Sequence, residues 1–354
     1  MSLFKKTYQD NLRTLKKEQA KIVPTIVEEI DPFEAYVTEL YNDDLEPIEP
    51  VFLFKKNFAK IKHSYQLPIP LNAKFTRRTN NKFESVEAIL PTILPECKSV
   101  DSDFLTGYYL AKFHLNIPQI MTSFHAGISK DSMIQGMYHA VLKLRPKAKW
   151  QMFGCDAHPI QKYKNISKNG IRLPCDVYDI NTSNSINLQL SESISYKSVD
   201  LYTCDIRSNS AADLLKQLIL IREYLTNDAR LVLRLPLNWN SCYTAMQTIL
   251  LFCASQFKTI KVFKTPWGSI PKYYLILNGF KELINTQKHA ILRTYLDALN
   301  TNPNIPLISS TYFDIDKDNR QIFMQNISQA YINMLKFEDS YTSDETLLIW
   351  TDMV

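Results

Sequence analysis

Short apolar runs alternate with amphipathic stretches along residues 104–280, and this alternation constrains the fold more than any other feature of the sequence. The apolar runs have the length of β-strands, and the intervening stretches have the 3.6-residue period of helices that bury one face. Strands that alternate with helices of about 10–15 residues predict βαβ units and a mostly parallel, doubly wound sheet. We therefore expect an α/β protein with a Rossmann-like core.

The expected elements follow one another from residue 106 to residue 280. We expect strands at 117–126, 150–156, 199–206, 230–237, 258–266 and 272–280, and a short strand and turn at 171–180. We expect helices at 106–115, 132–146, 212–225 and 241–257. Three regions flank this predicted domain at 101–280: a charged helical arm at 1–30, a Pro-rich irregular extension at 31–100, and a mostly helical C-terminal extension at 281–354.

The charge of the chain permits nucleic-acid binding without requiring it, because 41 Lys and Arg face 36 Asp and Glu, a net charge of +5. A basic patch in the Pro-rich extension lies beside Phe75 and Phe83, an arrangement that suits RNA phosphates and bases. An exposed polar loop is the alternative interpretation. The patch consists of Lys74, Arg77, Arg78 and Lys82.

Other residue patterns exclude several classes of site. The six cysteines form no C-x-x-C pair, and no apolar run approaches about 18 residues, so we expect a reduced, cytoplasmic protein without a membrane segment. The histidines lack zinc-type spacing, and we expect no metal site. Trp239 and Trp267, each near a strand end, are candidates for exposed aromatic contacts. With only 7 glycines in 354 residues, any nucleotide pocket must be atypical, since such pockets use Gly-rich loops.

Candidate ligand-binding residues follow the expected strands, because doubly wound sheets bind ligands at the carboxyl ends of their strands. The first strand runs into the sequence His125-Ala-Gly127-Ile-Ser129, which would face a cofactor. Asp156 ends the second strand, where it could accept ribose hydroxyls. Asp176 is taken as the end of the third strand, where it could meet an adenine amine.

The order of the segments and several local strings resemble the FtsJ-like ribose-2′-O-methyltransferase family, which includes viral cap methyltransferases. VDLYTCDIRS at 199–208 resembles the family's fourth-strand segment, and EYLTNDARLVLRLP at 223–236 resembles the segment that carries its second catalytic Lys. KYYLILNGF at 272–280 resembles the last strand, and TGYYLAKFHL at 106–115 resembles the helix that supplies the first catalytic Lys. The resemblance implies a Rossmann-like methyltransferase fold and S-adenosylmethionine as the cofactor.

The same resemblance implies catalytic positions. The family uses a Lys-Asp-Lys-Glu tetrad, in which the second Lys deprotonates the ribose 2′-hydroxyl for attack on the sulfonium methyl. In this sequence the position of the first Lys corresponds to Lys112 and that of the Asp to Asp205. The position of the second Lys corresponds to Arg234, and that of the Glu corresponds to Lys272. Arginine stays protonated at neutral pH and is no general base, and Lys272 replaces an acceptor by a cation. We therefore predict a catalytically degenerate site, in which His125 could also crowd the methionine part of the cofactor.

Three functional interpretations remain open from the sequence. The run at 230–264 also resembles the small subunit of the poxvirus mRNA capping enzyme, a methyltransferase-fold protein that activates its partner enzyme. A regulatory or structural subunit of a viral RNA capping or replication system is thus the first interpretation, with a capping or replication enzyme as partner and the host cytoplasm or virion as location. An active S-adenosylmethionine-dependent RNA cap 2′-O-methyltransferase is the second. A structural protein that reuses the fold is the third.

Overall fold

The structure is a computed structural model of the 354-residue chain. It describes residues 31–41, 49–50, 101–126, 132–156, 175–179, 195–204, 218–219, 221–235, 249–250, 252–267, 272–282 and 313–314. The chain divides into two compact units, Met1–Glu34 and Ala35–Val354. The 3-10 helix η1 (Glu34–Tyr36) spans this boundary, and all strands and α-helices below belong to the second unit.

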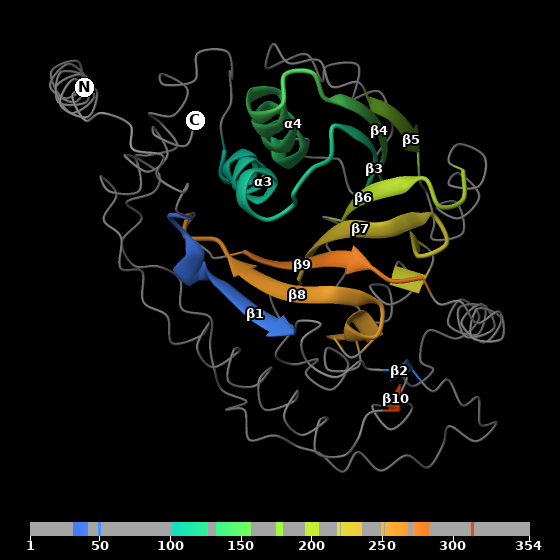
Figure 1. Cartoon of the computed structure of the whole chain (residues 1–354). Helices are drawn as coiled ribbons and strands as arrows, with labels where there is room; N and C mark the ends of the chain where they lie inside the picture. Colours follow the sequence, from blue (N-terminus) through green and yellow to red (C-terminus); the bar gives the residue numbers. More distant parts are fainter. Residues whose placement is uncertain are drawn as a thin grey trace, which may run out of the picture. The chain divides into compact units, whose positions relative to one another are not determined.

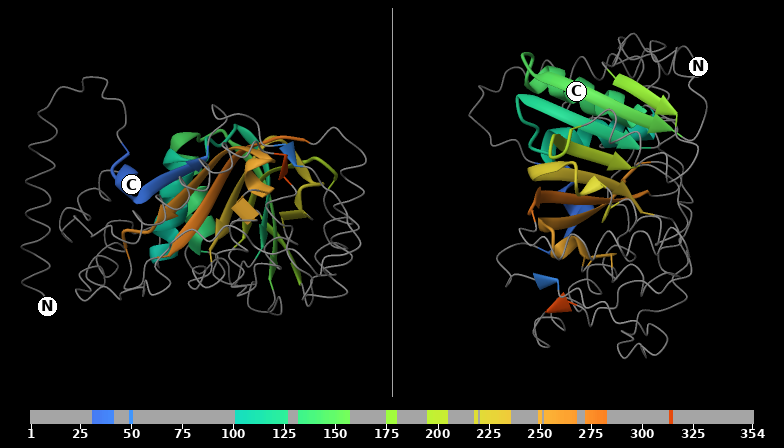
Figure 2. Two further views of the ribbon diagram at one scale, coloured as in Figure 1. Left: turned by 90° about the horizontal axis from the view of Figure 1, so that it is seen from below. Right: turned by 90° about the vertical axis from the view of Figure 1, so that its right-hand side faces the viewer.

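An eight-stranded sheet forms the centre of the second unit, in the order β1-β8-β9-β7-β6-β3-β4-β5 (Figure 1). Its strands are β1 (Val37–Tyr41), β3 (Ile120–Ala126), β4 (Lys149–Asp156), β5 (Cys175–Asp179), β6 (Val199–Cys204), β7 (Leu225–Arg234), β8 (Phe257–Lys264) and β9 (Tyr273–Phe280). A separate two-stranded sheet pairs β2 (Glu49–Pro50) with β10 (Phe313–Asp314). Two further views show the twist that accumulates across the large sheet (Figure 2).

The direction of the strands identifies the fold class. Pairing is parallel from β5 through β4, β3 and β6 to β7, whereas β9 lies antiparallel between β7 and β8. The last strand of the expected domain is thus inserted, reversed, between the fifth and sixth strands, the arrangement that distinguishes the methyltransferase variant of the Rossmann-like fold. The predicted α/β Rossmann-like methyltransferase fold with a mostly parallel sheet is confirmed.

The expected strands match the structure, and the differences lie at their ends. The expected helices at 212–225 and 241–257 lie mostly outside the described residues, as do the expected arm at 1–30 and the C-terminal extension at 281–354. Helix α4 (Ser132–Leu144) occupies the predicted 132–146 segment, and α3 (Ser102–Phe113) begins four residues before the predicted start. Leu225, placed in a helix by its spacing, is instead the first residue of β7. Its spacing was misleading because a buried strand and a buried helix end are equally apolar. The expected Pro-rich extension contributes β1, which pairs antiparallel with β8 at the edge of the sheet.

Helices α3 and α4 cover the same face of the sheet. The Tyr109 ring of α3 lies 4.8 Å from the ring of Phe263 on β8, and the Tyr138 ring of α4 lies 5.8 Å from that of Trp150 on β4. The strand register places Phe263 and Trp150 on one face of the sheet. Figure 1 shows both helices on this side.

Two glycines allow α3 and α4 to pack with their backbones in contact. A methyl group added at Gly107 would lie 1.8 Å from the carbonyl oxygen of Met133, and one at Gly136 would lie 2.0 Å from that of Phe104. Both distances are far below van der Waals contact. Two of the seven glycines of the chain are thus required by this crossing rather than by a phosphate-binding loop.

We expect Gly107→Ala to lower the free energy of unfolding by about 3 kcal/mol, because the helices must move apart to admit the methyl group. This loss exceeds the gain of about 1 kcal/mol that alanine brings to a helix interior. Urea unfolding monitored by circular dichroism measures the difference. Lys143→Ala, at an exposed position of α4, is the control and should change stability by less than about 0.5 kcal/mol. An unchanged midpoint for Gly107→Ala would contradict the close crossing.

Candidate functional site

The switch point of the sheet lies between β3 and β6. From β3 the chain continues through β4 to β5 on one side, and from β6 it continues to β7 on the other. Doubly wound sheets bind ligands outside the carboxyl ends of the strands at such a point. Here the last residues of the two strands, Ala126 and Cys204, are register partners. The predicted site residues Gly127, Ser129 and Asp205 lie outside the described residues.

Two acids occupy matching positions at the carboxyl ends of β4 and β5. Asp156 is the last residue of β4, as predicted, and its register partner is Asp179, the last residue of β5. Asp176 is the second residue of β5 and pairs with Phe153, so the expected strand end at Asp176 was wrong by three residues. The sequence CDVYD could have indicated a strand that ends at Asp179, because its apolar residues continue past Asp176 to the second acid.

His125 is completely buried within β3 rather than exposed at its end. Its Nε2 lies 2.7 Å from Ser123 Oγ, and its Nδ1 lies 2.7 Å from Thr203 Oγ1 on β6. Trp150 Nε1 donates to the same Ser123 oxygen at 2.7 Å. A neutral imidazole that accepts from Ser123 and donates to Thr203 satisfies these groups. Burial lowers the pKa of His125 to about 3, so the ring is neutral at pH 7 and belongs to the core.

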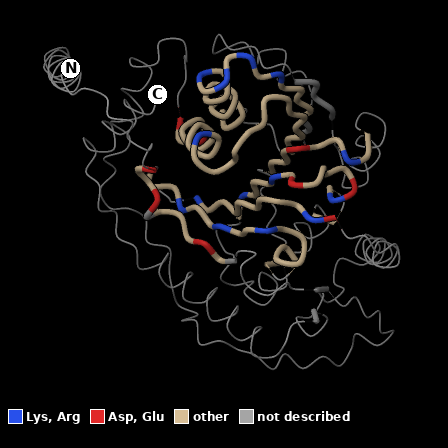
Figure 3. Tube along the Cα trace, viewed as in Figure 1, with Lys and Arg blue, Asp and Glu red and all other residues tan. Residues whose placement is uncertain are grey.

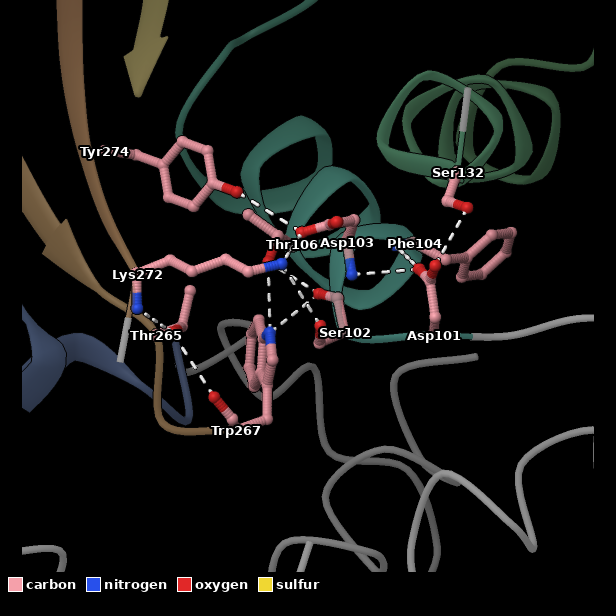
Figure 4. A network of polar contacts seen from close by, with 10 residues as sticks. All are labelled: Asp101, Ser102, Asp103, Phe104, Thr106, Ser132, Thr265, Trp267, Lys272 and Tyr274. Atoms are coloured by element: carbon pink, nitrogen blue, oxygen red, sulfur yellow. Dashed lines mark hydrogen bonds and ion pairs between the residues drawn. The ribbon is translucent and has the colours of Figure 1, made fainter. Parts of the chain in front are cut away.

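Lys272 and Asp103 form an ion pair between the start of β9 and the first turn of α3 (Figure 4). The side chain of Asp103 is 5% exposed and that of Lys272 is 20% exposed. Lys272 Nζ also lies 3.4 Å from Ser102 Oγ, and the Tyr274 hydroxyl lies 3.4 Å from Asp103 Oδ1. Lys272, one of the residues predicted for the tetrad, is therefore held by an acid of α3.

Trp267 extends this contact between α3 and the β8–β9 connection. Its indole N–H donates to the carbonyl of Ser102 at 2.8 Å and to Thr106 Oγ1 at 3.0 Å (Figure 4). The backbone N–H of Lys272 also donates a hydrogen bond to Thr265 Oγ1 at 2.9 Å. The prediction of an exposed aromatic at Trp267 was wrong, because this side chain is 1% exposed. Trp239 lies outside the described residues.

The N-terminus of α3 is capped by a second acid. Asp101 accepts hydrogen bonds from the backbone N–H groups of Asp103 and Phe104 at 3.0 and 2.9 Å, and Ser132 of α4 donates to its other oxygen at 3.0 Å. Acids in the first turn also interact favourably with the helix dipole. The sequence DSD before the apolar run carried this signal. The helix was nevertheless expected to begin at residue 106, so this cap was missed.

The structure brings two members of the predicted tetrad to one edge and places a third at the other. Arg234 ends β7 beside Tyr274 of β9, near Lys272 at the carboxyl edge. Lys112 lies in the last turn of α3, with its Nζ 5.3 Å from the Phe113 ring, and the following His114 carbonyl accepts from Asn278 near the end of β9. Nine residues of helix, about 13 Å, separate Lys112 from Asp103 along the helix axis. Lys112 and Lys272 are not brought together.

Two further findings concern metals and membranes. Within the described ranges there is no group of three or more His, Cys, Asp or Glu side chains that could hold a metal ion. None of the helices in the described part of the chain is long and apolar enough to cross a membrane.

Comparison with known proteins assigns no family to this chain. No family model and no curated protein sequence matches the chain. Similar solved structures include an S-adenosylmethionine-dependent O-methyltransferase from Thermotoga maritima, at 13% identity and a TM-score of 0.34 over 51% of this chain and 66% of that one. The pyocyanin biosynthetic protein PhzM is similar at 12% identity and a TM-score of 0.32, over 49% of this chain and 55% of that one. The CurJ carbon methyltransferase is similar at 11% identity and a TM-score of 0.35, over 56% of this chain and 68% of that one.

These likenesses are distant, and the chain spans 66% and 55% of the length of the first two structures. At TM-scores of 0.32–0.35 they add nothing to the strand order, on which the fold assignment rests. The class that fold and site define is thus a methyltransferase-fold protein. Its cofactor, substrate and partner are matters of proposal.

We expect the stability contributed by His125 to depend on pH. The unfolded chain binds a proton at His125 near pH 6.5, whereas the folded chain binds it only near pH 3, so stability falls as the pH falls through this window. Uptake of one proton by the unfolded chain alone changes the free energy of unfolding by about 1.4 kcal/mol per pH unit. Urea unfolding of the wild type and His125→Gln between about pH 5.5 and about pH 4.5 isolates it. Equal pH slopes in the two proteins would show that His125 is protonated in the fold.

We expect Lys272→Met to lower the free energy of unfolding by about 3 kcal/mol, because it leaves the buried Asp103 carboxylate without its cation. The double variant Asp103→Asn with Lys272→Met should recover most of this loss. The matched control is the exposed pair of Lys258 and Asp228, 2.6 Å apart, where Lys258→Met should cost less than about 1 kcal/mol. Additive losses in the double variant would contradict a coupled pair.

Proposed function

We propose that this chain is a methyltransferase-fold protein that retains an edge for the adenosine part of S-adenosylmethionine but does not catalyse ribose 2′-O-methyl transfer. In this proposal it acts as a regulatory or structural subunit of a viral RNA capping or replication system. The ion pair of Lys272 with Asp103 is the observation that carries the loss of catalysis.

The pair matters because of the positions that its two residues occupy. In the family that the sequence resembles, the last strand supplies an acid and the helix before motif one supplies a Lys. Here Lys272, just before the last strand, stands at the position carried over from that acid, and it pairs with Asp103 at the start of the helix rather than lying near Lys112. Lys272 cannot accept a hydrogen bond and so cannot orient a base.

Arg234 completes the argument against base catalysis. It ends β7, at the position that corresponds to the family's general base. A guanidinium remains protonated at neutral pH and cannot remove the 2′-hydroxyl proton. Arg234 therefore cannot serve as the base, and Lys272, the other described tetrad position at the carboxyl edge, is held in its ion pair with Asp103.

The residues at the ends of β4 and β5 fit the adenosine part of the cofactor. Carboxylates accept hydrogen bonds from ribose hydroxyls and from an adenine amine, and Asp156 and Asp179 stand in register on adjacent strands where such groups would lie. When bound, S-adenosylmethionine supplies an electrophilic methyl group. His125 does not obstruct this edge, because its ring is enclosed between β3, β4 and β6.

The capping or replication partner and the host cytoplasm or virion are proposed on the sequence resemblance. RNA binding by Lys74, Arg77, Arg78 and Lys82, which lie outside the described residues, is proposed because this basic patch lies beside Phe75 and Phe83 in the sequence. A second function, an active RNA cap 2′-O-methyltransferase, is favoured by one observation: β6 ends at Cys204, immediately before the predicted catalytic Asp205, at the switch point. Such an enzyme would need a base other than Arg234.

A methyl-transfer assay tests the proposal. The purified chain is incubated with S-adenosylmethionine carrying a labelled methyl group and with capped RNA. We expect no product above the level of heat-unfolded protein, and no change with Asp205→Ala or Arg234→Lys alone. Product that forms with the wild type and disappears in Asp205→Ala would overturn the proposal in favour of the active enzyme.

A further inference from the structure

The exposed large apolar side chains of the described residues all lie at the edge opposite to the candidate site. Ile120 begins β3 and is 72% exposed, and Tyr196 precedes β6 and is 60% exposed. Leu142 and Leu144, at 39% and 46%, end α4 just before the turn into β4. This amino edge is where the parallel strands begin. Grouped apolar exposure of this kind marks binding surfaces more often than scattered single residues do.

Four exposed cations lie on the same edge, between the end of α4 and the start of β4 (Figure 3). No acid interrupts the run from 142 to 149. Their side chains form no ion pair or hydrogen bond in the described part of the chain. These cations are Lys143, Arg145, Lys147 and Lys149.

Three acids of this edge are engaged by other groups. Asp200 accepts from the Thr122 backbone N–H and the Thr226 hydroxyl, both at 2.9 Å. Asp228 pairs with Lys258, and Glu282 pairs with Lys197. The four cations therefore keep their charge available for an anionic partner.

Tyr196 adds a preformed aromatic platform. Its ring stacks on the ring of Tyr224 with centroids 5.2 Å apart and an interplanar angle of 8°. Tyr224 is 1% exposed, so the inner ring is fixed in the core while the outer ring presents its free face to solvent. A base can stack on such a ring at little conformational cost.

The cations and the platform lie on neighbouring strands. Ile120 of β3 pairs directly with Lys149 of β4, and β6, which follows Tyr196, pairs with the other side of β3. Two strand spacings, about 10 Å, therefore separate the start of β4 from the start of β6. One short stretch of polymer can reach both.

We propose that this amino edge, made of Lys143, Arg145, Lys147, Lys149, Ile120 and Tyr196, binds single-stranded RNA without sequence preference. The cations contact phosphates, and Tyr196 stacks on a base while Ile120 packs against its neighbour. The choice of RNA rests on the proposed function. An RNA strand supplies anions and stacking surfaces in regular succession, which matches four uncompensated cations beside a free aromatic face better than an acidic protein surface does.

Fluorescence anisotropy with a labelled oligouridylate of about 20 nucleotides tests this surface on the full chain, without cofactor or partner. We expect the wild type to bind at about 50 mM salt. The variant with Lys143→Gln, Arg145→Gln, Lys147→Gln and Lys149→Gln should bind at least about tenfold more weakly. Its slope of log affinity against log salt should fall by about 3, from four lost phosphate contacts. Tyr196→Leu should weaken binding about tenfold with the slope unchanged, and Tyr196→Phe should bind as the wild type does.

The control variant, Lys258→Gln with Lys261→Gln, removes two cations that face acids and should leave affinity within about twofold. Absence of binding by the wild type would overturn the proposal and leave an acidic protein as the partner. Binding that is lost only on changing Lys74, Arg77, Arg78 and Lys82 to Gln would overturn it in favour of the Pro-rich extension. Methyl transfer does not enter the readout, so an active enzyme would refute the proposed function and leave this result unaffected.

Discussion

The ion pair between Asp103 and Lys272 fixes the first turn of α3 to the start of β9, and the arrangement of the carboxyl edge depends on it. Because Asp103 is buried, its charge requires this cation, and the Trp267 hydrogen bonds hold the same helix turn against the β8–β9 connection. Helix α4 then packs on α3 through the glycine crossing.

The two edges of the sheet differ in how their charges are used. At the carboxyl edge, Lys272 is neutralised within the protein, and the buried His125 cluster is uncharged. At the amino edge, three acids are engaged and the cations between 143 and 149 are not. The carboxyl edge is thus suited to holding a neutral or weakly charged nucleoside part, and the amino edge to attracting a polyanion.

The sequence predicted the elements that depend on local pattern and missed those that depend on distant contacts. Strands β3 and β4 follow from apolar runs bounded by turn residues, and α4 follows from its 3.6-residue period. The ion pair joins residues 169 positions apart, which no local pattern specifies. Lys112 was assigned as the first catalytic Lys because the helix segment that contains it resembles the family's helix. A local resemblance does not show which end of the helix reaches Lys272, and that end carries Asp103. The end of β5 was misplaced because both of its acids follow an apolar residue or cysteine.

We propose that an edge for the adenosine part of the cofactor persists in this fold although the residues at the predicted tetrad positions cannot support catalysis. Calorimetric titration of the folded chain with S-adenosylhomocysteine tests it most directly. We expect measurable binding that Asp156→Ala and Asp179→Ala each weaken at least about tenfold, which corresponds to the loss of one charge-assisted hydrogen bond, whereas Asp176→Ala should bind as the wild type does. No binding at millimolar ligand, or equal loss in all three variants, would contradict it and show that the fold is retained for its surfaces alone.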